Sequence, residues 1–206
     1  MEDLVEERVI VGMRQLRLLR PRSAETLIDE DAFGEDEFLP YWAELWPSGL
    51  ALAEHVTGAG VAGKVVLELG CGLAVPSLAA ALCGAEVLAT DWAPEAIALA
   101  EQNALGNGVS LRAALLRWDA PGSLGADSFD LVLAADVLYE ARNALPLLDL
   151  LDRAVAPGGT ALLADPGRRH ARLFLDAAPP RGWVVTVHPT ALLPRGAVYE
   201  LARRPW

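Results

Sequence analysis

The stretch VLELGCGLAVPSLAAALCGAEVLATD, residues 66–91, decides the fold class of this 206-residue chain. It opens with an apolar run, turns through two closely spaced glycines, continues as an alanine-rich helical segment over 75–83 and ends in a second apolar run at 86–90. Neither run alternates with polar residues, which is typical of parallel strands covered on both faces. A strand, a glycine turn, a helix and a second strand predict one βαβ unit of an α/β sheet.

Strands and helices keep alternating beyond this unit. Two last runs, 183–189 and 197–204, flank a turn at Pro194–Gly196 and predict an antiparallel pair at one edge. The whole pattern predicts an α/β fold with a doubly wound, mostly parallel, seven-stranded Rossmann-like sheet and an antiparallel C-terminal edge. The other expected strands are 64–69, 86–90, 109–117, 129–135 and 159–164, and the expected helices are 75–83, 94–105, 143–155 and 169–178.

Residues 1–60 follow a different pattern and are expected to form a short N-terminal extension packed on the core of a main domain at 61–206. No repeat or low-complexity linker separates the two parts. The extension is expected to contain a hairpin made by 8–21 and 24–29, an acidic loop at 29–37, an aromatic lid segment at 39–49 and a helix at 48–56.

Composition excludes several classes of protein. A hydrophobic fraction of 53% excludes a disordered chain. The net charge of −11 argues against nucleic acid and anionic membranes as partners, because both require a basic surface. Two cysteines form no disulfide framework, and the acidic N-terminus is unlike a signal peptide. A cytoplasmic protein is expected, with a monomer as the expected state.

An acidic residue lies at or just after each of five predicted strands: Glu68, Asp91, Asp119, Asp136 and Asp165. Each could cap the helix that follows. Ligands of open parallel sheets, however, bind at the carboxyl ends of the strands, where these five would converge. Without compensating lysines or arginines, a rim of carboxylates repels phosphates. It suits a ligand with hydroxyls, an amine and positive charge.

The glycine turn narrows the choice of ligand. Gly70 and Gly72 follow the first strand directly, so the backbone can approach a ligand closely. The nicotinamide-binding fingerprint would require glycine or alanine at position 75, where this chain has valine. A dehydrogenase is therefore disfavoured.

Four motifs together resemble a known family. Residues 66–91 resemble the first motif and second strand of class I S-adenosylmethionine-dependent methyltransferases. LPYWAELWPSGLALAEHV (39–56), FDLVLAADVLYE (129–140) and LADPGR (163–168) narrow the resemblance to methyltransferase family 16. Within it, the chain is most similar to the lysine methyltransferases of the electron transfer flavoprotein β subunit and their bacterial relatives. The resemblance runs from Phe38 to Arg168.

The resemblance implies S-adenosylmethionine as the cofactor and gives roles to ten residues. Ala74 departs from the family pattern, which commonly has a third glycine there, and this bears on cofactor affinity. No metal is expected, because His55, His170 and His188 have no ligand spacing. By resemblance, Glu68, Gly70 and Gly72 bind the methionine part, Asp91 the ribose and Asp119 the adenine, Trp46, Trp92 and Ala135 complete the cofactor pocket, and Asp136 and Tyr139 lie at the methyl-transfer site.

The leading hypothesis is a protein-lysine N-methyltransferase, with the electron transfer flavoprotein β subunit or a ribosomal protein among the implied partners. One alternative is an N-methyltransferase for a small, nicotinamide-like amine, and a second is a non-catalytic scaffold of the same fold. Asp136 is expected to capture and orient the amine, because a carboxylate stabilises the ammonium form and is a poor aid to its deprotonation. The identity of the acceptor and the number of methyl groups stay open.

Overall fold

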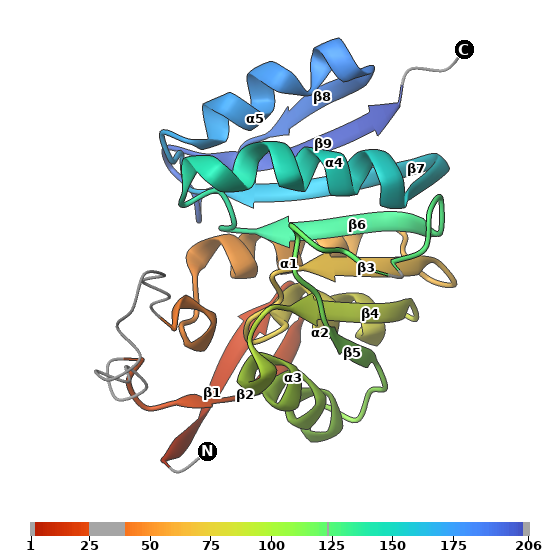
Figure 1. The fold of residues 1–206 in the computed structure, drawn as a ribbon. Helices are drawn as coiled ribbons and strands as arrows, with labels where there is room; N and C mark the ends of the chain where they lie inside the picture. The colour runs from red at the N-terminus through yellow and green to blue at the C-terminus, as the bar shows by residue number, and fades with distance from the viewer. Residues whose placement is uncertain (1–2, 25–39, 123, 204–206) are drawn as a thin grey trace.

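A computed structural model of the chain describes residues 3–24, 40–122 and 124–203 and contains the predicted seven-stranded sheet (Figure 1). Its strand order is β5-β4-β3-β6-β7-β9-β8. Neighbouring strands are parallel from β5 to β7, and β9 is antiparallel to both β7 and β8, so the expected antiparallel edge is confirmed. The strands are β3 (Val65–Leu69), β4 (Glu86–Asp91), β5 (Arg112–Leu115), β6 (Phe129–Ala135), β7 (Val155–Asp165), β8 (Trp183–His188) and β9 (Ala197–Arg203).

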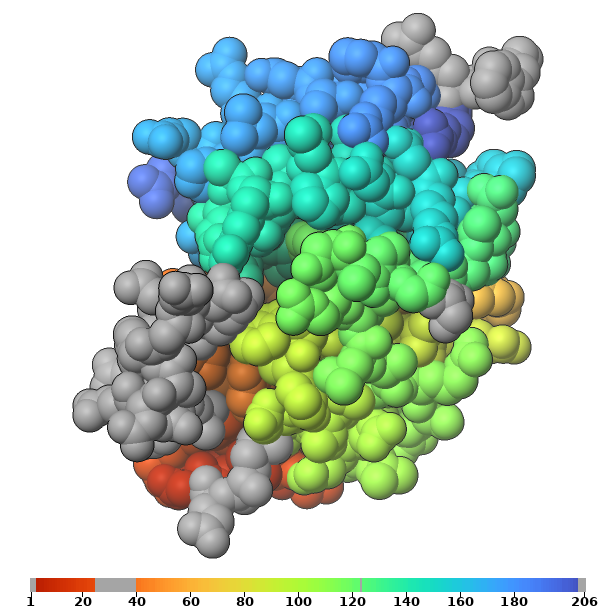
Figure 2. Space-filling model, viewed as in Figure 1, coloured from red at the N-terminus to blue at the C-terminus, as the bar shows by residue number. Residues whose placement is uncertain are grey.

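Helices cover both faces of this sheet, which explains why its strands are apolar throughout. On β3, Val66 packs with α1 (Pro47–Gly58), α2 (Val75–Leu82) and α3 (Pro94–Gly106), whereas the next residue, Leu67, packs with α4 (Ala144–Ala154) and α5 (Ala171–Ala177). In the space-filling view, the upper part of the molecule is formed by the C-terminal half of the chain, coloured teal and blue, which includes α4 and α5 (Figure 2). No helix in the described ranges is long and apolar enough to cross a lipid bilayer.

Two strands differ from the sequence prediction by more than one residue at an end. The edge strand β5 has four residues where nine were expected, because its only neighbour, β4, ends at Asp91 opposite Leu115. Strand β7 begins at Val155, four residues earlier than expected, and its register with β6 shifts between Phe129 and Leu131.

The N-terminal extension contains a hairpin, but not the one expected. Strand β1 (Leu4–Val11) pairs antiparallel with β2 (Arg14–Pro21) through a turn at Gly12, whose φ is +58°. The expected pairing of 8–21 with 24–29 is therefore wrong, since both strands lie before residue 22. The rest of 24–29 beyond Ala24 and the predicted acidic loop lie outside the described residues.

Two asparagines, Asn103 in α3 and Asn107 at its C-cap, attach this hairpin to the main domain. The Asn103 and Asn107 side chains each accept a backbone N–H from β2 and donate to the carbonyl of the same residue, at Leu19 and Arg17 respectively. Asn103 Nδ2 also lies 3.3 Å from the carbonyl oxygen of Leu73, in the glycine loop. The extension therefore packs on the main domain through directed hydrogen bonds as well as apolar contacts.

Replacing Asn103 by alanine is expected to lower the free energy of unfolding by about 2–4 kcal/mol, because buried backbone groups lose their partners. Asn103 is 1% exposed. Urea denaturation followed by circular dichroism measures the change. Gln102→Ala, on the exposed face of the same helix, is the matched control and should change stability by less than about 0.5 kcal/mol. Equal effects of the two substitutions would contradict this role of Asn103.

Candidate active site

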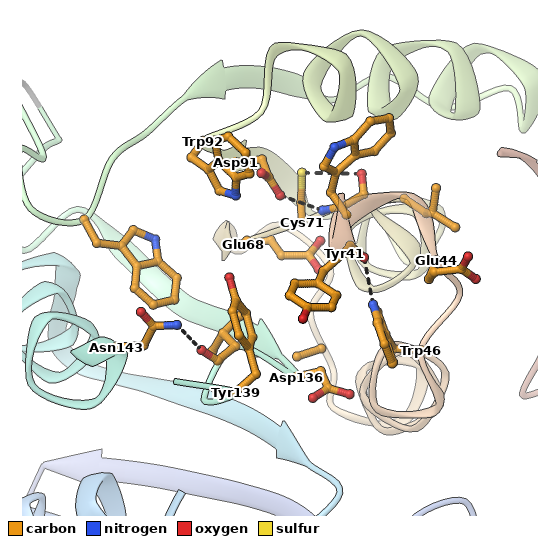
Figure 3. Close-up of a pocket in the computed structure, with 18 of the residues that line it drawn as sticks. Tyr41, Glu44, Trp46, Glu68, Cys71, Asp91, Trp92, Asp136, Tyr139 and Asn143 are labelled. Atoms are coloured by element: carbon orange, nitrogen blue, oxygen red, sulfur yellow. Dashed lines mark hydrogen bonds between the residues drawn. The ribbon is translucent and has the colours of Figure 1, made fainter. Parts of the chain in front are cut away.

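A cavity of about 1250 Å³ lies at the carboxyl ends of the central strands, next to the aromatic segment that precedes α1 (Figure 3). Ligand pockets typically have about 300–1,000 Å³, so this one has room for a cofactor and part of a second molecule. All ten residues selected from the sequence line it: Trp46, Glu68, Gly70, Gly72, Asp91, Trp92, Asp119, Ala135, Asp136 and Tyr139.

The glycine loop between β3 and α2 forms one wall of the cavity. Gly70 and Gly72 both have left-handed φ angles, +68° and +50°. The N–H of Gly72 donates to Asp91 Oδ2 at 2.9 Å, which ties the loop to the end of β4. A Cβ at Gly72 would lie 2.9 Å from the backbone oxygen of Trp42, so this glycine also allows the aromatic segment to approach.

Gly72→Ala is expected to destabilise the protein by roughly 2–4 kcal/mol through backbone strain and overpacking. It should also weaken binding of the expected cofactor, S-adenosylmethionine, because Trp42 must move. Calorimetry and thermal unfolding measure the two effects. Gly106→Ala is the control: it lies at the end of α3 with no atom within 4 Å of the added Cβ, and should be neutral or slightly stabilising. Unchanged stability of Gly72→Ala would contradict the close approach.

The side chain of Ala74 lies away from the cavity. Its φ is +60°, which is unusual for a residue with a side chain, and it is the N-cap of α2. It is fully buried beside Cys71, Ala89 and Ala100 and is not among the residues that line the cavity. Its methyl group therefore takes no space from the cavity, and the expected effect of Ala74 on cofactor affinity has no steric basis there.

Two buried acids lie beneath the loop. Glu68 accepts hydrogen bonds from the backbone N–H and the hydroxyl of Ser77, in the first turn of α2. Burial raises the pKa of Glu68 to about 8, although the bonds from Ser77 oppose the shift. Burial also raises the pKa of Asp91, against the backbone N–H groups of Gly72 and Ala93 that donate to it.

The expected rim of uncompensated carboxylates is wrong, because three arginines line the same cavity. Both oxygens of Asp119 accept hydrogen bonds from Arg117, which lowers the pKa of Asp119, and the Asp119 side chain is 66% exposed. The cavity stays acidic, since six acidic residues outnumber three arginines. Its ion pairs are Arg117–Asp119, Arg142–Glu140 and Arg168–Asp136.

The five strand-end acids do not all meet at the cavity. Asp165 is fully buried, and its Oδ1 accepts the backbone N–H groups of Gly167 and Arg168, so it serves its own loop and is not a cavity residue. None of the five is the N-cap of a described helix, so the capping alternative is also wrong. Asp136 instead bonds to the side chains of Arg168 and Ser48.

Aromatic rings form a second wall of the cavity. The centroid of the Tyr41 ring lies 5.2 Å from that of Tyr139 and 6.2 Å from that of Trp46. The rings of Tyr41 and Tyr139 lie side by side in the cavity, tilted by 56° to each other (Figure 3). Burial, and then the negative charge of Glu140, raise the pKa of Tyr139. Trp42 is 9% exposed and packs into the core.

Sequence reasoning missed several side chains of this site. Ser48 and Arg168 lie inside the motifs of the resemblance, at 39–56 and 163–168, but were given no role. Tyr41 was a weaker omission, because the aromatic segment had been expected to act as a lid. Among the described residues, no group of three or more His, Cys, Asp or Glu side chains could hold a metal ion.

Comparison with known proteins gives one family. The profile of the family described as lysine methyltransferase matches residues 35–176. The chain is 36% identical over 135 residues to the electron transfer flavoprotein β subunit lysine methyltransferase of Danio rerio, covering 63% of this chain and 51% of that protein. It is 33% identical over 127 residues to EEF1A lysine methyltransferase 3 of Mus musculus, covering 59% and 54%. The chain thus spans about half the length of these curated relatives.

Solved structures support the fold. The ribosomal protein L11 methylase of Lactobacillus delbrueckii subsp. bulgaricus superposes with a TM-score of 0.63 and 24% sequence identity, over 77% of this chain and 79% of that one. The likeness concerns the sheet and its helices.

Proposed function

Because this chain belongs to the lysine methyltransferase family, we propose that it transfers a methyl group from S-adenosylmethionine to a lysine side chain of a protein substrate. The observation that carries the proposal is the meeting, in one cavity, of the glycine loop, Asp91, Asp136 and Tyr139. Curated relatives are named for lysine methylation of the electron transfer flavoprotein β subunit and of EEF1A. The former is the first protein substrate to test.

The polar and aromatic groups that line the cavity fit the cofactor. Asp91 Oδ2 accepts the N–H of Gly72 and Oδ1 that of Ala93. A carboxylate oxygen can accept more than one hydrogen bond, so the carboxylate can also serve as an acceptor for ribose hydroxyls. Trp92, 42% exposed beside Asp91, offers a ring to the adenine. The acidic lining favours a cationic ligand. When bound, S-adenosylmethionine supplies an electrophilic methyl group on a sulfonium.

In this proposal Asp119 contributes less to adenine binding than the family resemblance implied. Its two oxygens are engaged by Arg117, so an adenine amino group would have to share an oxygen with that guanidinium. We propose that Glu68 contributes charge to the methionine end only when the ligand's ammonium favours its ionised form, because its pKa of about 8 leaves it mostly protonated at pH 7.

Methyl transfer requires an uncharged nitrogen. For a lysine with a pKa of about 10.4, deprotonation at pH 7.4 costs about 4 kcal/mol. Tyr41, Tyr139 and Trp46 exclude water from the acceptor and lower this cost by desolvation. Asp136 orients the nitrogen, and Tyr139 offers a hydroxyl or its ring.

The deciding experiment incubates the purified chain with methyl-labelled S-adenosylmethionine, in one arm with purified electron transfer flavoprotein β subunit and in another with a cell lysate. Label recovered as methyllysine after hydrolysis of the protein fraction supports the proposal. Label found only in the small-molecule fraction would favour the alternative acceptor, a small amine. No transfer in either arm, with no calorimetric binding of S-adenosylhomocysteine, would favour the scaffold.

A further inference from the structure

The carboxylate expected to receive the acceptor amine is already paired. Arg168 Nε donates to Asp136 Oδ1, and Ser48 Oγ donates to Asp136 Oδ2 at 3.3 Å. The Asp136 side chain is 4% exposed and that of Arg168 is 33% exposed. The φ of Asp136 is +58°, a left-handed conformation that turns the chain sharply after β6. The buried carboxylate of Asp136, on a residue with a left-handed backbone, is therefore paired with the guanidinium of Arg168, which comes from the loop after β7.

A second acid fixes the loop from which Arg168 reaches the cavity. Asp165 Oδ1 accepts the backbone N–H groups of Gly167 at 2.8 Å and Arg168 at 2.7 Å. Gly167 has a φ of +90°, and a Cβ there would lie 2.3 Å from the backbone oxygen of Arg195. The guanidinium carbon also lies 5.9 Å from the Trp46 ring centroid. The backbone of Arg168 is thus held by a fully buried acid, and its head group lies between Asp136 and an aromatic ring.

We propose that Arg168 is a charge-balancing residue, which neutralises Asp136 so that the acceptor nitrogen binds at Asp136 Oδ2 in its uncharged, nucleophilic form. The inference rests on the proposed function, because it requires an amine at Asp136. An isolated carboxylate would hold the amine as ammonium and oppose the reaction. A carboxylate paired with a guanidinium still accepts a hydrogen bond from the amine but attracts its extra proton far less. Asp136 Oδ2 accepts the hydroxyl of Ser48, and the same oxygen can accept a second hydrogen bond from the amine.

Other charges near Asp136 do not replace Arg168 in this role. Arg117 and Arg142 each lie beside an acid of their own. The titratable and charged side chains that line the cavity with Asp136, or lie behind it, are Tyr41, Glu44, Glu68, Cys71, Asp91, Arg117, Asp119, Tyr139, Glu140, Arg142, Asp165 and Arg168. Apart from the three arginines, these groups are carboxylic acids, phenols or a thiol, and none of them carries a positive charge that could offset the charge of Asp136.

The test measures protons released on binding and needs no identified acceptor. Two analogues of S-adenosylhomocysteine serve as probes, and in both a nitrogen replaces the sulfur. In the first probe this nitrogen carries an aminobutyl arm, which resembles a lysine side chain. In the second, the reference probe, it carries a butyl arm without the terminal amine. Calorimetry in buffers of different ionisation enthalpy counts the protons that each probe releases. The difference between the probes belongs to the terminal amine. Wild-type protein is expected to bind that amine uncharged and to release close to one proton at pH 8.

In Arg168→Gln, the pH at which half a proton is released should rise by at least about one unit, since Asp136 would then hold the ammonium. Arg168→Lys should behave like the wild type, and so should Arg169→Gln, the same charge change at an exposed neighbour outside the cavity. Arg168→Lys also guards against misfolding of the glutamine variant. The proposal is overturned if wild type and Arg168→Gln release protons alike, or if wild type binds the amine without releasing one.

Two further outcomes separate the proposals. Weakening of S-adenosylhomocysteine binding more than tenfold by Arg168→Gln would make Arg168 a ligand of the cofactor's carboxylate, and would overturn the charge-balancing role alone. Failure of the wild-type protein to bind S-adenosylhomocysteine or either probe would overturn the proposed function, and the inference with it.

Discussion

Replacing Asp136 by asparagine is expected to lower methyl transfer at saturating substrate at least about 100-fold, which corresponds to about 2.7 kcal/mol of transition-state stabilisation. The loss has two physical causes. The substrate amine loses the carboxylate that accepts its hydrogen bond. The guanidinium of Arg168 is also left without its counter-charge, next to the amine that receives the methyl group. Asparagine is the right replacement, because it tolerates the left-handed backbone at φ +58° better than most residues.

The matching measurement is calorimetric binding of S-adenosylhomocysteine, which should change less than about threefold, since Asp136 is assigned to the acceptor. Asp176→Asn on α5, an exposed aspartate outside the cavity, is the control and should retain wild-type turnover. If Asp136→Asn loses cofactor binding as severely as turnover, Asp136 belongs to the cofactor site and its assignment to the amine is wrong.

Local patterns were enough to predict the architecture. The apolar runs at 64–69, 86–90 and 129–135 became strands because an α/β sheet buries both faces, and the carboxyl ends of such strands converge. That convergence is why Glu68, Asp91 and Asp136, far apart in sequence, were expected together, and all three line one cavity. Trp46 and Tyr139, which line the same cavity, were expected there from the family resemblance. The main features of the fold and ten of the residues that line the cavity were therefore predictable.

The pairing of side chains across the site was not predictable, because it depends on loop conformation and on reach. Asp136 meets Ser48, 88 residues earlier, and Arg168, 32 residues later. Neither contact has a spacing that marks it in the sequence. The orientation of Asp165 was not predictable either. Its position after a predicted strand indicated a cavity residue, but the tight turn at Gly167 directs its carboxylate into its own loop.

The N-terminal extension was the part least accessible from sequence. Its hairpin pairs 4–11 with 14–21, and the outer edge of β2 is satisfied by the side chains of Asn103 and Asn107. Two asparagines four residues apart on a helix are usually solvated, and only the position of the hairpin gives them a role.

Replacing Glu68 by glutamine is expected to stabilise the ligand-free protein progressively as the pH rises. In the folded protein the pKa of Glu68 is about 8, whereas in the unfolded chain it is near its ordinary value of 4.5. Between these values the folded state holds a proton that the unfolded state has lost, so this group makes the wild type less stable as the pH increases. The full window corresponds to at most about 5 kcal/mol.

Glutamine cannot ionise, yet its carbonyl oxygen can still accept the two hydrogen bonds from Ser77. Urea denaturation at pH 5, 6, 7 and 8 should therefore show the advantage of Glu68→Gln growing across the series. Glu86→Gln, an exposed glutamate at the start of β4, is the control and should run parallel to the wild type. Parallel curves for Glu68→Gln would mean that Glu68 is ionised in the folded state.

The same variant separates stability from function. If Glu68 ionises to hold the ammonium of the cofactor, glutamine should weaken S-adenosylhomocysteine binding about tenfold or more, because a charge-assisted hydrogen bond is replaced by a neutral one. The protein would then be more stable at pH 8 and bind its ligand less well. The positive charge of the ligand would then give a physical reason for a glutamate beneath the glycine loop that destabilises the ligand-free protein. Unchanged binding would instead limit Glu68 to its contact with Ser77.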